Sequence, residues 1–176
     1  MKAKVVEVGP RDGFQNVKSF IPTENKIKII DGLVKAGIKK IQITSFVSEK
    51  AIPQMRDAPR IAEAVLGAYE GVDFFALVPN FYGAKAAVAA GLKEISPVIS
   101  LSESHNKANV KRTRDESIEE LKRIRQSFPD VRITQDIACV FGCPFEGEMP
   151  IQDLVDLVGR VKETGINAFT LCDTVG

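Results

Sequence analysis

Strand-like and helix-like segments alternate strictly along this chain, and this order limits the fold more than any other feature of the sequence. Short aliphatic runs predict six strands, at residues 4–8, 40–45, 72–78, 94–99, 131–138 and 167–171. Apolar residues at helical spacing predict five helices between them, at residues 23–36, 58–68 and 82–90, in the segment that Asp115 caps, and around Leu157. Such alternation is typical of a parallel sheet built from right-handed βαβ crossovers.

Two architectures fit this order, and the turn after the first predicted strand separates them. A doubly wound sheet would place a glycine-rich phosphate-binding loop there, but residues 9–13 read Gly-Pro-Arg-Asp-Gly and contain no G-x-G-x-x-G. We therefore predict a (β/α)8 TIM barrel. Eight units need roughly 200 residues or more, so residues 1–176 are expected to form a single catalytic barrel domain truncated before strands seven and eight.

Polar residues follow every predicted strand, which is where a barrel carries its active site. They are Arg11 and Asp12, Thr44 and Ser45, Asn80, residues 102–106, residues 139–146, and Asp173. The Arg11-Asp12 pair is the sharpest of these features. A fixed cation beside a carboxylate could hold an anionic oxygen and a divalent metal side by side, although a simple capping ion pair has the same sequence.

Charge and composition exclude several classes of partner. The chain has 24 Lys and Arg against 23 Asp and Glu, for a net charge of +1, so we expect no nucleic-acid partner and no attraction to an anionic membrane. Nothing resembles a signal peptide or a membrane span, which predicts a cytoplasmic protein. The three cysteines, Cys139, Cys143 and Cys172, are expected to be reduced thiols with structural or pocket-lining roles.

Seven short motifs, taken together and in order, carry a family resemblance. They are the segments 8–16 (VGPRDGFQN), 44–48 (TSFVS), 53–55 (PQM), 78–80 (VPN), 102–106 (SESHN), 141–147 (FGCPFEG) and 173–176 (DTVG). In this spacing the chain resembles the hydroxymethylglutaryl-CoA lyases, metal-dependent barrel enzymes that cleave a carbon–carbon bond. The resemblance spans essentially the whole chain and corresponds to the N-terminal three quarters of such a barrel.

The resemblance implies an activity and a cofactor. The expected reaction cleaves 3-hydroxy-3-methylglutaryl-CoA to acetoacetate and acetyl-CoA, a step of leucine degradation and ketone-body formation. It implies Mg²⁺ or Mn²⁺ as cofactor, an acyl-CoA as small-molecule partner, and a homo-oligomer, most simply a dimer. Arg11 corresponds to the arginine that stabilises the enolate, Asp12 to a metal-ligating aspartate, and Asp173 to an active-site aspartate.

The remaining candidate residues are assigned to substrate binding. They are Gln15, Gln42, Ser45, Asn80 and Lys107. Lys107 opens a basic run with Lys111, Arg112 and Arg114, which either meets the phosphates of coenzyme A or is only a solvated face.

Two departures from the family pattern qualify these expectations. Gln42 stands where the family generally has a glutamate, which puts rate or acyl preference in question. The family's His-x-His metal ligands and its catalytic cysteine are expected beyond Gly176, and the lone His105 cannot replace them. The chain by itself is therefore expected to lack full activity. A related aldolase or acyl-CoA condensing enzyme, and a non-catalytic short paralogue that acts as a subunit, stay open as alternatives.

Overall fold

The computed structural model describes residues 3–176, which form two compact units. The first unit comprises residues 3–78 and 82–95, and the second comprises residues 79–81 and 96–176. Strand β3 (Glu94–Ser100) contributes its first two residues to the first unit and the rest to the second. The strand order β1-β2-β3-β4-β5 follows the chain, as expected for successive βα units.

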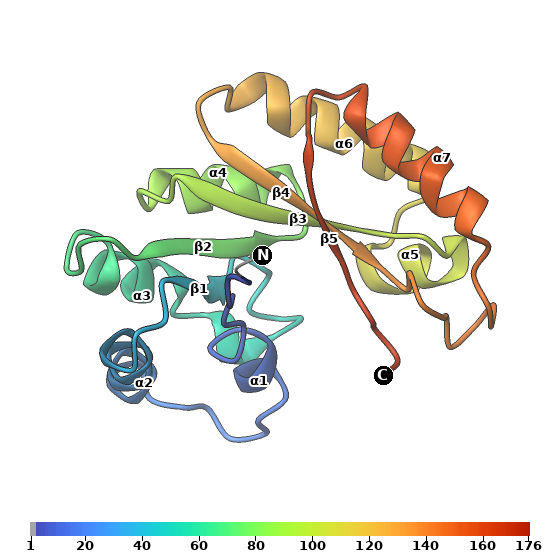
Figure 1. The fold of residues 1–176 in the computed structure, drawn as a ribbon. Coiled ribbons are helices and arrows are strands. Elements are labelled where there is room, and N and C mark those ends of the chain that lie inside the picture. Colours follow the sequence, from blue (N-terminus) through green and yellow to red (C-terminus); the bar gives the residue numbers. More distant parts are fainter. Residues whose placement is uncertain (1–2) are drawn as a thin grey trace. The chain divides into compact units, whose positions relative to one another are not determined.

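The first unit is a parallel strand pair with helices (Figure 1). Its elements are α1 (Asp12–Gln15), α2 (Thr23–Lys35), β1 (Lys40–Ser45), the 3₁₀ turn η1 (Pro53–Met55), α3 (Ala58–Val65), β2 (Asp73–Val78) and nearly all of α4 (Phe81–Ala89). Strands β1 and β2 pair in parallel, with a register shift between Gln42 and Thr44. The predicted strands at 40–45 and 72–78 and the helices near 23–36, 58–68 and 82–90 are thus confirmed to within a few residues.

The core of this unit lies between β1 and the helices beside it. Ile41 and Ile43 are fully buried, and α3 turns Ile61, Ala62 and Val65 inward at helical spacing. Helices α2 and α3 lie side by side next to β1 (Figure 1). The hydrophobic pattern of the sequence therefore faces the sheet, as the prediction requires.

The strand predicted at residues 4–8 is largely absent, which corrects the count of six strands. Only Glu7 forms a bridge, to Ile41, through hydrogen bonds of 2.9 Å to the Lys40 carbonyl and 2.8 Å from the Gln42 amide. Val5 and Val6 are 65% and 43% exposed. Without apolar packing for these side chains among the described residues, β propensity alone does not extend the pairing.

The second unit repeats the same plan with two long helices. It contains the rest of β3, then α5 (Glu103–Val110), α6 (Arg114–Ser127), β4 (Arg132–Ala138), α7 (Ile151–Lys162) and β5 (Ala168–Leu171). Strands β4 and β5 pair in parallel with Asp136 opposite Thr170. Helices α6 and α7 lie side by side and bury Leu121, Ile124 and Leu157 (Figure 1).

Helix α5 lies in a segment expected to be a polar loop. It has no apolar stripe, so hydrophobic periodicity could not predict it. Polar contacts hold it instead: Ser102 caps its first turn by accepting from the His105 amide at 3.0 Å. Buried Asn106 accepts from the Ser100 amide at 2.9 Å and donates to the Arg112 carbonyl at 2.8 Å and to Ser117 Oγ at 2.9 Å.

The cap of α6 also differs from expectation. Thr113, rather than Asp115, is the N-cap, and it forms a reciprocal capping box with Glu116. Asp115 instead forms an ion pair with Arg160 of α7, in which Arg160 Nη2 lies 2.6 Å from Asp115 Oδ1. Among the described residues, no helix is both long and apolar enough to cross a membrane.

Candidate functional site

The turn that carries Arg11 and Asp12 is fixed by its own backbone. The carbonyl of Val8 accepts from the amides of Arg11 at 2.9 Å and Asp12 at 2.7 Å, and Gly9 accepts from Phe14 at 3.1 Å. These bonds close the short helix α1, with Arg11 at its N-cap. Both side chains therefore start from a defined backbone position directly beyond the Glu7 bridge.

Gln42 of β1 holds the Arg11 guanidinium. Arg11 Nε donates to Gln42 Oε1 at 2.5 Å, and a second guanidinium nitrogen, Nη1, donates to Asp12 Oδ1 at 2.8 Å. The Gln42 side chain comes from the middle of a strand and is 1% exposed, while Arg11 is 16% exposed. A buried amide thus orients a partly solvent-accessible cation.

Asp12 is more exposed to solvent than Arg11 and Gln42. Its carboxylate is 55% exposed, and Oδ1 accepts from both Arg11 and Gln15, the latter at 3.1 Å. The structure therefore brings together four of the sequence-predicted residues: Arg11, Asp12, Gln15 and Gln42. We call these four residues the arginine cluster.

Ser45 is placed differently from the arginine cluster. It ends β1, is 1% exposed, and its hydroxyl is buried without a hydrogen-bond partner among the described residues. A buried hydroxyl in this state is costly. Direct contact of Ser45 with a ligand would require its surroundings to open.

The other predicted residues belong to the second unit and do not form a cluster of their own. Asn80 precedes α4 and is half-buried. Lys107 lies on α5, is 58% exposed, and pairs with Glu103 one helical turn earlier at 3.3 Å. Asp173 follows β5, is exposed, and accepts from the Gly176 amide at 3.2 Å.

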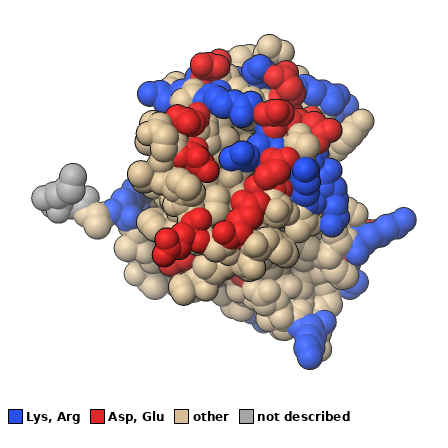
Figure 2. Space-filling model, turned by 90° about the vertical axis from the view of Figure 1, so that its right-hand side faces the viewer, with Lys and Arg blue, Asp and Glu red and all other residues tan. Residues whose placement is uncertain are grey.

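Two arginines of the basic run are used to hold the chain. Both terminal nitrogens of Arg112 donate to the Pro79 carbonyl, at 3.2 and 3.3 Å, and Arg114 donates to the Leu101 carbonyl at 2.9 Å. Figure 2 shows basic and acidic side chains interleaved over the face in view rather than a basic field. Within the run, Lys107 therefore stays as the better candidate for a phosphate contact.

The sequence interpretation gave His105 no role, yet it anchors a polar network after β3. Its Nδ1 shares a short hydrogen bond with the buried hydroxyl of Ser100, and burial lowers the pKa of the imidazole. In the same loop region, Glu146 accepts from the Ser104 amide at 2.8 Å, and the hydroxyl and amide of Ser104 lower the pKa of this carboxyl. The S-E-S-H-N and F-E-G motifs are thereby joined.

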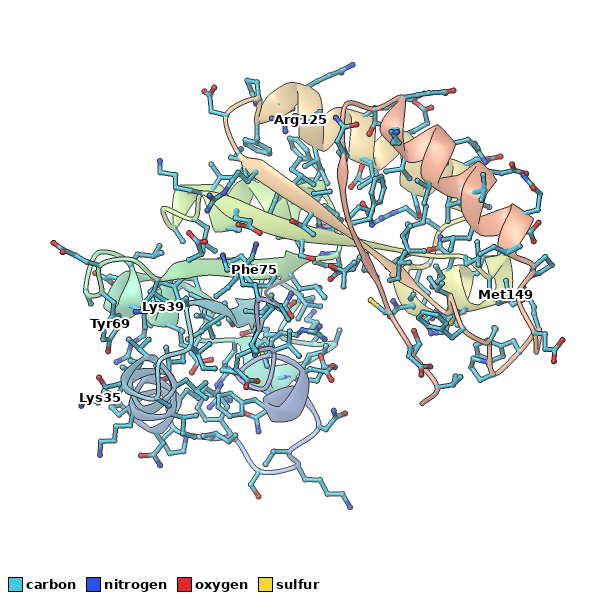
Figure 3. All side chains as sticks on the ribbon, viewed as in Figure 1. Lys35, Lys39, Tyr69, Phe75, Arg125 and Met149 are labelled. Atoms are coloured by element: carbon cyan, nitrogen blue, oxygen red, sulfur yellow. The ribbon has the colours of Figure 1, made fainter. Side chains whose placement is uncertain are left out.

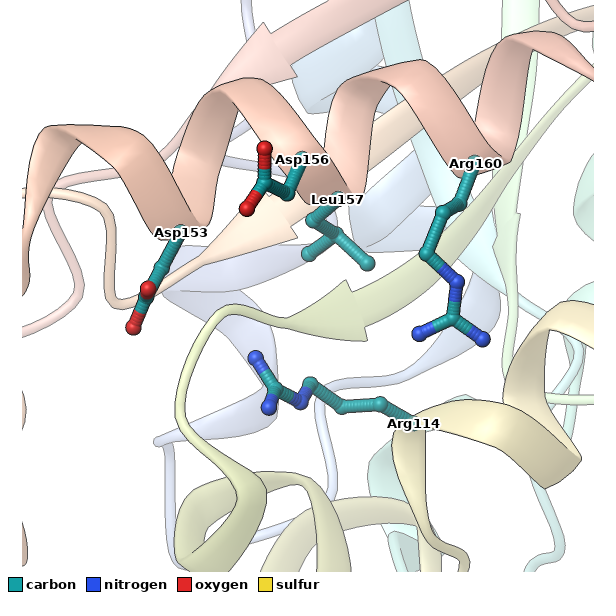
Figure 4. Close-up of a pocket in the computed structure, with 5 residues that line it drawn as sticks. All are labelled: Arg114, Asp153, Asp156, Leu157 and Arg160. Carbon is teal, nitrogen blue, oxygen red and sulfur yellow. The ribbon is translucent and has the colours of Figure 1, made fainter.

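A shallow hollow on the second unit is a poor match for an acyl-CoA (Figure 4). It measures about 130 Å³ and is lined by Leu157 and four charged residues, Arg114, Asp153, Asp156 and Arg160. Small-molecule pockets usually exceed roughly 300 Å³ and are mostly apolar. The hollow is better explained by the packing of α6 against α7 than by ligand binding.

The described residues supply only part of a metal site. No group of three or more His, Cys, Asp or Glu side chains among residues 3–176 is arranged to hold an ion. Asp12 offers a single hard carboxylate of the kind that Mg²⁺ and Mn²⁺ prefer. These residues therefore fit one ligand of such an ion and not a complete set.

Comparison with known proteins places this geometry in a family. The HMGL-like family model matches residues 2–176. A mitochondrial hydroxymethylglutaryl-CoA lyase from Bos taurus is 38% identical over 99% of this chain and 54% of its own length. The chain thus spans about half the length of that relative.

Solved structures agree with the sequence match. The HMG-CoA lyase of Bacillus subtilis superposes with a TM-score of 0.94 at 38% identity, covering 99% of this chain and 59% of that one. An HMG-CoA lyase of Acinetobacter baumannii in complex with coenzyme A and 3-methylmalate gives 0.93 at 35% identity, with 100% and 59% coverage. These neighbours confirm the predicted fold class, with the chain covering part of a TIM barrel. Because the family model matches nearly every residue, the chain belongs to the HMGL-like family.

Proposed function

We propose that this chain is part of a lyase that cleaves 3-hydroxy-3-methylglutaryl-CoA to acetoacetate and acetyl-CoA. Two findings support the proposal: 38% identity to a hydroxymethylglutaryl-CoA lyase over 99% of the chain, and the arginine cluster itself. The neighbour in complex with coenzyme A supports an acyl-CoA as substrate. A cytoplasmic location and a homodimer are part of the same proposal.

The hydrogen bond from Arg11 to Gln42 is the observation that carries the mechanism. Cleavage of the carbon–carbon bond moves an electron pair toward the thioester carbonyl and leaves an enolate oxygen. A guanidinium held in place before the reaction stabilises that charge without reorganisation. Because Gln42 is neutral, it orients Arg11 without cancelling its charge.

Asp12 would hold the divalent metal that the resemblance implies. Both of its side-chain hydrogen bonds are made by Oδ1, which leaves Oδ2 for a cation. A bound Mg²⁺ or Mn²⁺ would act as a Lewis acid toward the substrate's hydroxyl and carbonyl oxygens. Gln15 would keep the carboxylate oriented through its own hydrogen bond to Oδ1.

The remaining candidates are proposed for substrate contacts. Gln15 of the first unit would contact the polar part of the acyl group, and Gln42 would act through Arg11, which it holds. Asn80 of the second unit is a separate candidate for a substrate contact. Lys107 would meet a phosphate of coenzyme A, because its exposed pair with Glu103 is weak enough to exchange. Asp173, which is exposed after β5, would serve as the second active-site carboxylate. Ser45 fits least well, because its hydroxyl is buried.

Gln42 favours one alternative function. A neutral amide beside Arg11, where the family generally has a glutamate, suits an aldolase or acyl-CoA condensing enzyme that handles another acyl group. A non-catalytic subunit is the third reading. Assays of the chain, and of the longer product of its reading frame, with 3-hydroxy-3-methylglutaryl-CoA and Mn²⁺ would separate them. We expect acetoacetate from the longer protein only, and its loss in Arg11→Ala. Turnover of a different acyl-CoA would support the alternative.

A further inference from the structure

Two cysteines lie together where β4 leads into the loop that follows it. Cys139 is fully buried and Cys143 is 5% exposed, and they share one apolar cluster with Ala138. Val98 and Met149 pack against this cluster, and Figure 3 marks Met149 on the loop that leads to α7. The sequence predicts structural or pocket-lining roles for all three cysteines, and the fold places these two in one cluster.

Cys139 and Cys143 lie in one buried cluster, and each changes the pKa of the other: Cys143 raises the pKa of Cys139, and Cys139 lowers the pKa of Cys143. Cys172 is half-buried, and its Sγ lies 3.9 Å from the Thr170 carbonyl. Its backbone pairs with Ile137 and Val140, not with either cysteine. Cys139 and Cys143 therefore form the buried pair, and Cys172, which is half-buried, is the cysteine whose substitution serves as a control.

Backbone contacts fix both members of the pair. Cys139 has a φ of 59°, a left-handed conformation that glycine adopts with less strain, and its amide donates to Thr174 Oγ1 at 2.8 Å. The amide and carbonyl of Cys143 exchange hydrogen bonds of 2.8 and 2.9 Å with Gly147. Both cysteines therefore start from defined backbone positions in the same apolar cluster.

The two thiols differ in acidity. Burial alone would raise the pKa of Cys143, but hydrogen bonds from Ser102 and from the amides of Phe145 and Glu146 outweigh it and lower the pKa. The Phe145 amide lies 3.3 Å from Cys143 Sγ. Burial, and then the neighbouring Cys143, raises the pKa of Cys139 to about 11. Cys143 is thus the thiol that reacts first, and Cys139 is the thiol that reacts second.

We propose that Cys139 and Cys143 are a dithiol–disulfide couple, a modification site that reacts with small-molecule disulfides of the glutathione class. The Cys143 thiolate attacks one sulfur of the disulfide, whose S–S bond breaks and releases one thiolate. Cys139 then gives up its proton to water, attacks Cys143 Sγ and expels the second thiolate. The two cysteines lose two electrons in total, and the small disulfide gains them as it becomes two thiols.

The second step is helped by the first. Once Cys143 is in a mixed disulfide it carries no charge, so its contribution to the raised pKa of Cys139 disappears. Access to Cys143 runs through an irregular loop whose aromatic residues Phe141 and Phe145 are 66% and 61% exposed. Local opening of this loop, which the proposal requires because Cys143 is 5% exposed, would let the reagent reach the thiol without global unfolding.

Mass spectrometry of the whole chain after incubation with oxidised glutathione tests the proposal. We expect the folded chain to lose the mass of two hydrogen atoms and peptide mapping to link Cys139 to Cys143. Cys172→Ser should react in the same way. Cys139→Ser should stop at a mixed disulfide on Cys143, and in the reduced chain iodoacetamide should label Cys143 about tenfold faster than Cys139.

Opposite outcomes are equally specific. A disulfide that includes Cys172 would overturn the proposal. So would the absence of any internal disulfide in the folded chain under conditions in which the urea-denatured chain forms the 139–143 link. The main result, the disulfide between Cys139 and Cys143, is measured on the wild-type chain. It can therefore be interpreted even if one of the variants fails to fold.

Discussion

Arg11 donates a 2.5 Å hydrogen bond to the side chain of Gln42, which is almost completely buried in β1. This bond joins the cation of the arginine cluster to a strand, and the 2.8 Å contact with Asp12 joins it to its own turn. The guanidinium is therefore oriented from both sides.

Removing the side-chain amide of Gln42 should lower kcat more than it weakens substrate binding. Under the proposed function, Gln42→Ala in the lyase that contains this chain frees Arg11 Nε and should lower kcat by about tenfold or more, while Arg11→Ala should lower it by roughly 10²–10³. Gln42→Glu keeps an acceptor in place and should stay within about tenfold of wild type. Steady-state kinetics with 3-hydroxy-3-methylglutaryl-CoA measure these changes. A Gln42→Ala protein with unchanged kcat would show that the bond is only structural.

Metal binding by the chain alone should be weak. Asp12 is the single carboxylate of the arginine cluster, so an ion would keep mostly water ligands. Calorimetric titration of residues 1–176 with Mn²⁺ should show no saturation at micromolar concentrations, and Asp12→Asn should remove the little heat that appears. Tight stoichiometric binding would contradict the prediction and would point to ligands that the described geometry does not group together.

A buried ion pair should dominate the stability of the first unit. Lys26 is fully buried, and its Nζ lies 2.8 Å from Asp57, which also accepts from Thr23. Lys26→Met would leave that carboxylate buried without its cation, at a cost on the order of 3 kcal/mol in the free energy of unfolding. Lys35→Met is the matched control, because Lys35 is 74% exposed in its pair with Asp31. It should cost less than about 1 kcal/mol. Urea unfolding at one fixed protein concentration measures both.

His105 should make stability depend on pH. Burial lowers its pKa, so the folded chain binds this proton less readily than the unfolded chain does. The contribution is fully present above the ordinary pKa near 6.5 and is lost as the pH falls through the lower folded value. The urea concentration at the unfolding midpoint should therefore decrease as the pH is lowered below 6.5. Because His105 is the only histidine, His105→Asn should flatten this part of the profile. A profile that is unchanged in His105→Asn would rule the assignment out.

The sequence was most informative where apolar residues repeat with a fixed period. The runs at Ile41 and Phe74 and the stripe of α3 gave strands and a helix close to their observed bounds. It was least informative where polar contacts decide the structure. Helix α5 depends on side-chain hydrogen bonds of Ser102 and Asn106, whose partners are 3 and 11 residues away in the two examples that reach His105 and Ser117. Hydrophobic periodicity cannot predict a helix that is held by such polar contacts.

The residues of the candidate site also differ in how far the sequence could predict them. The R-D-G turn is local, so its sequence singles out Arg11 and Asp12 as neighbours, while their functional roles come from the family resemblance and stay a prediction. Gln42 was selected by resemblance, and its bond to Arg11 joins residues 31 positions apart that only the strand pairing brings together. The Cys139–Cys143 pair was missed because a C-x3-C spacing does not show that the first cysteine adopts a left-handed backbone.

The edges of the described chain should make it associate. Val5 and Val6 are exposed beside the Glu7 bridge, and Leu171 and Val175 are 47% and 49% exposed in and after β5. β5 itself has only four residues, and most of them are exposed. Unpaired strand edges with apolar side chains recruit further strands from any available source. We therefore expect residues 1–176 alone to form oligomers or aggregates. Charged substitutions at Leu171 and Val175 should reduce the association, with Lys substitutions at exposed Asp153 and Asp156 as surface controls. Analytical ultracentrifugation with thermal melting checks this. A monodisperse wild-type monomer with a cooperative transition at mesophilic temperatures would mean that these edges are already satisfied.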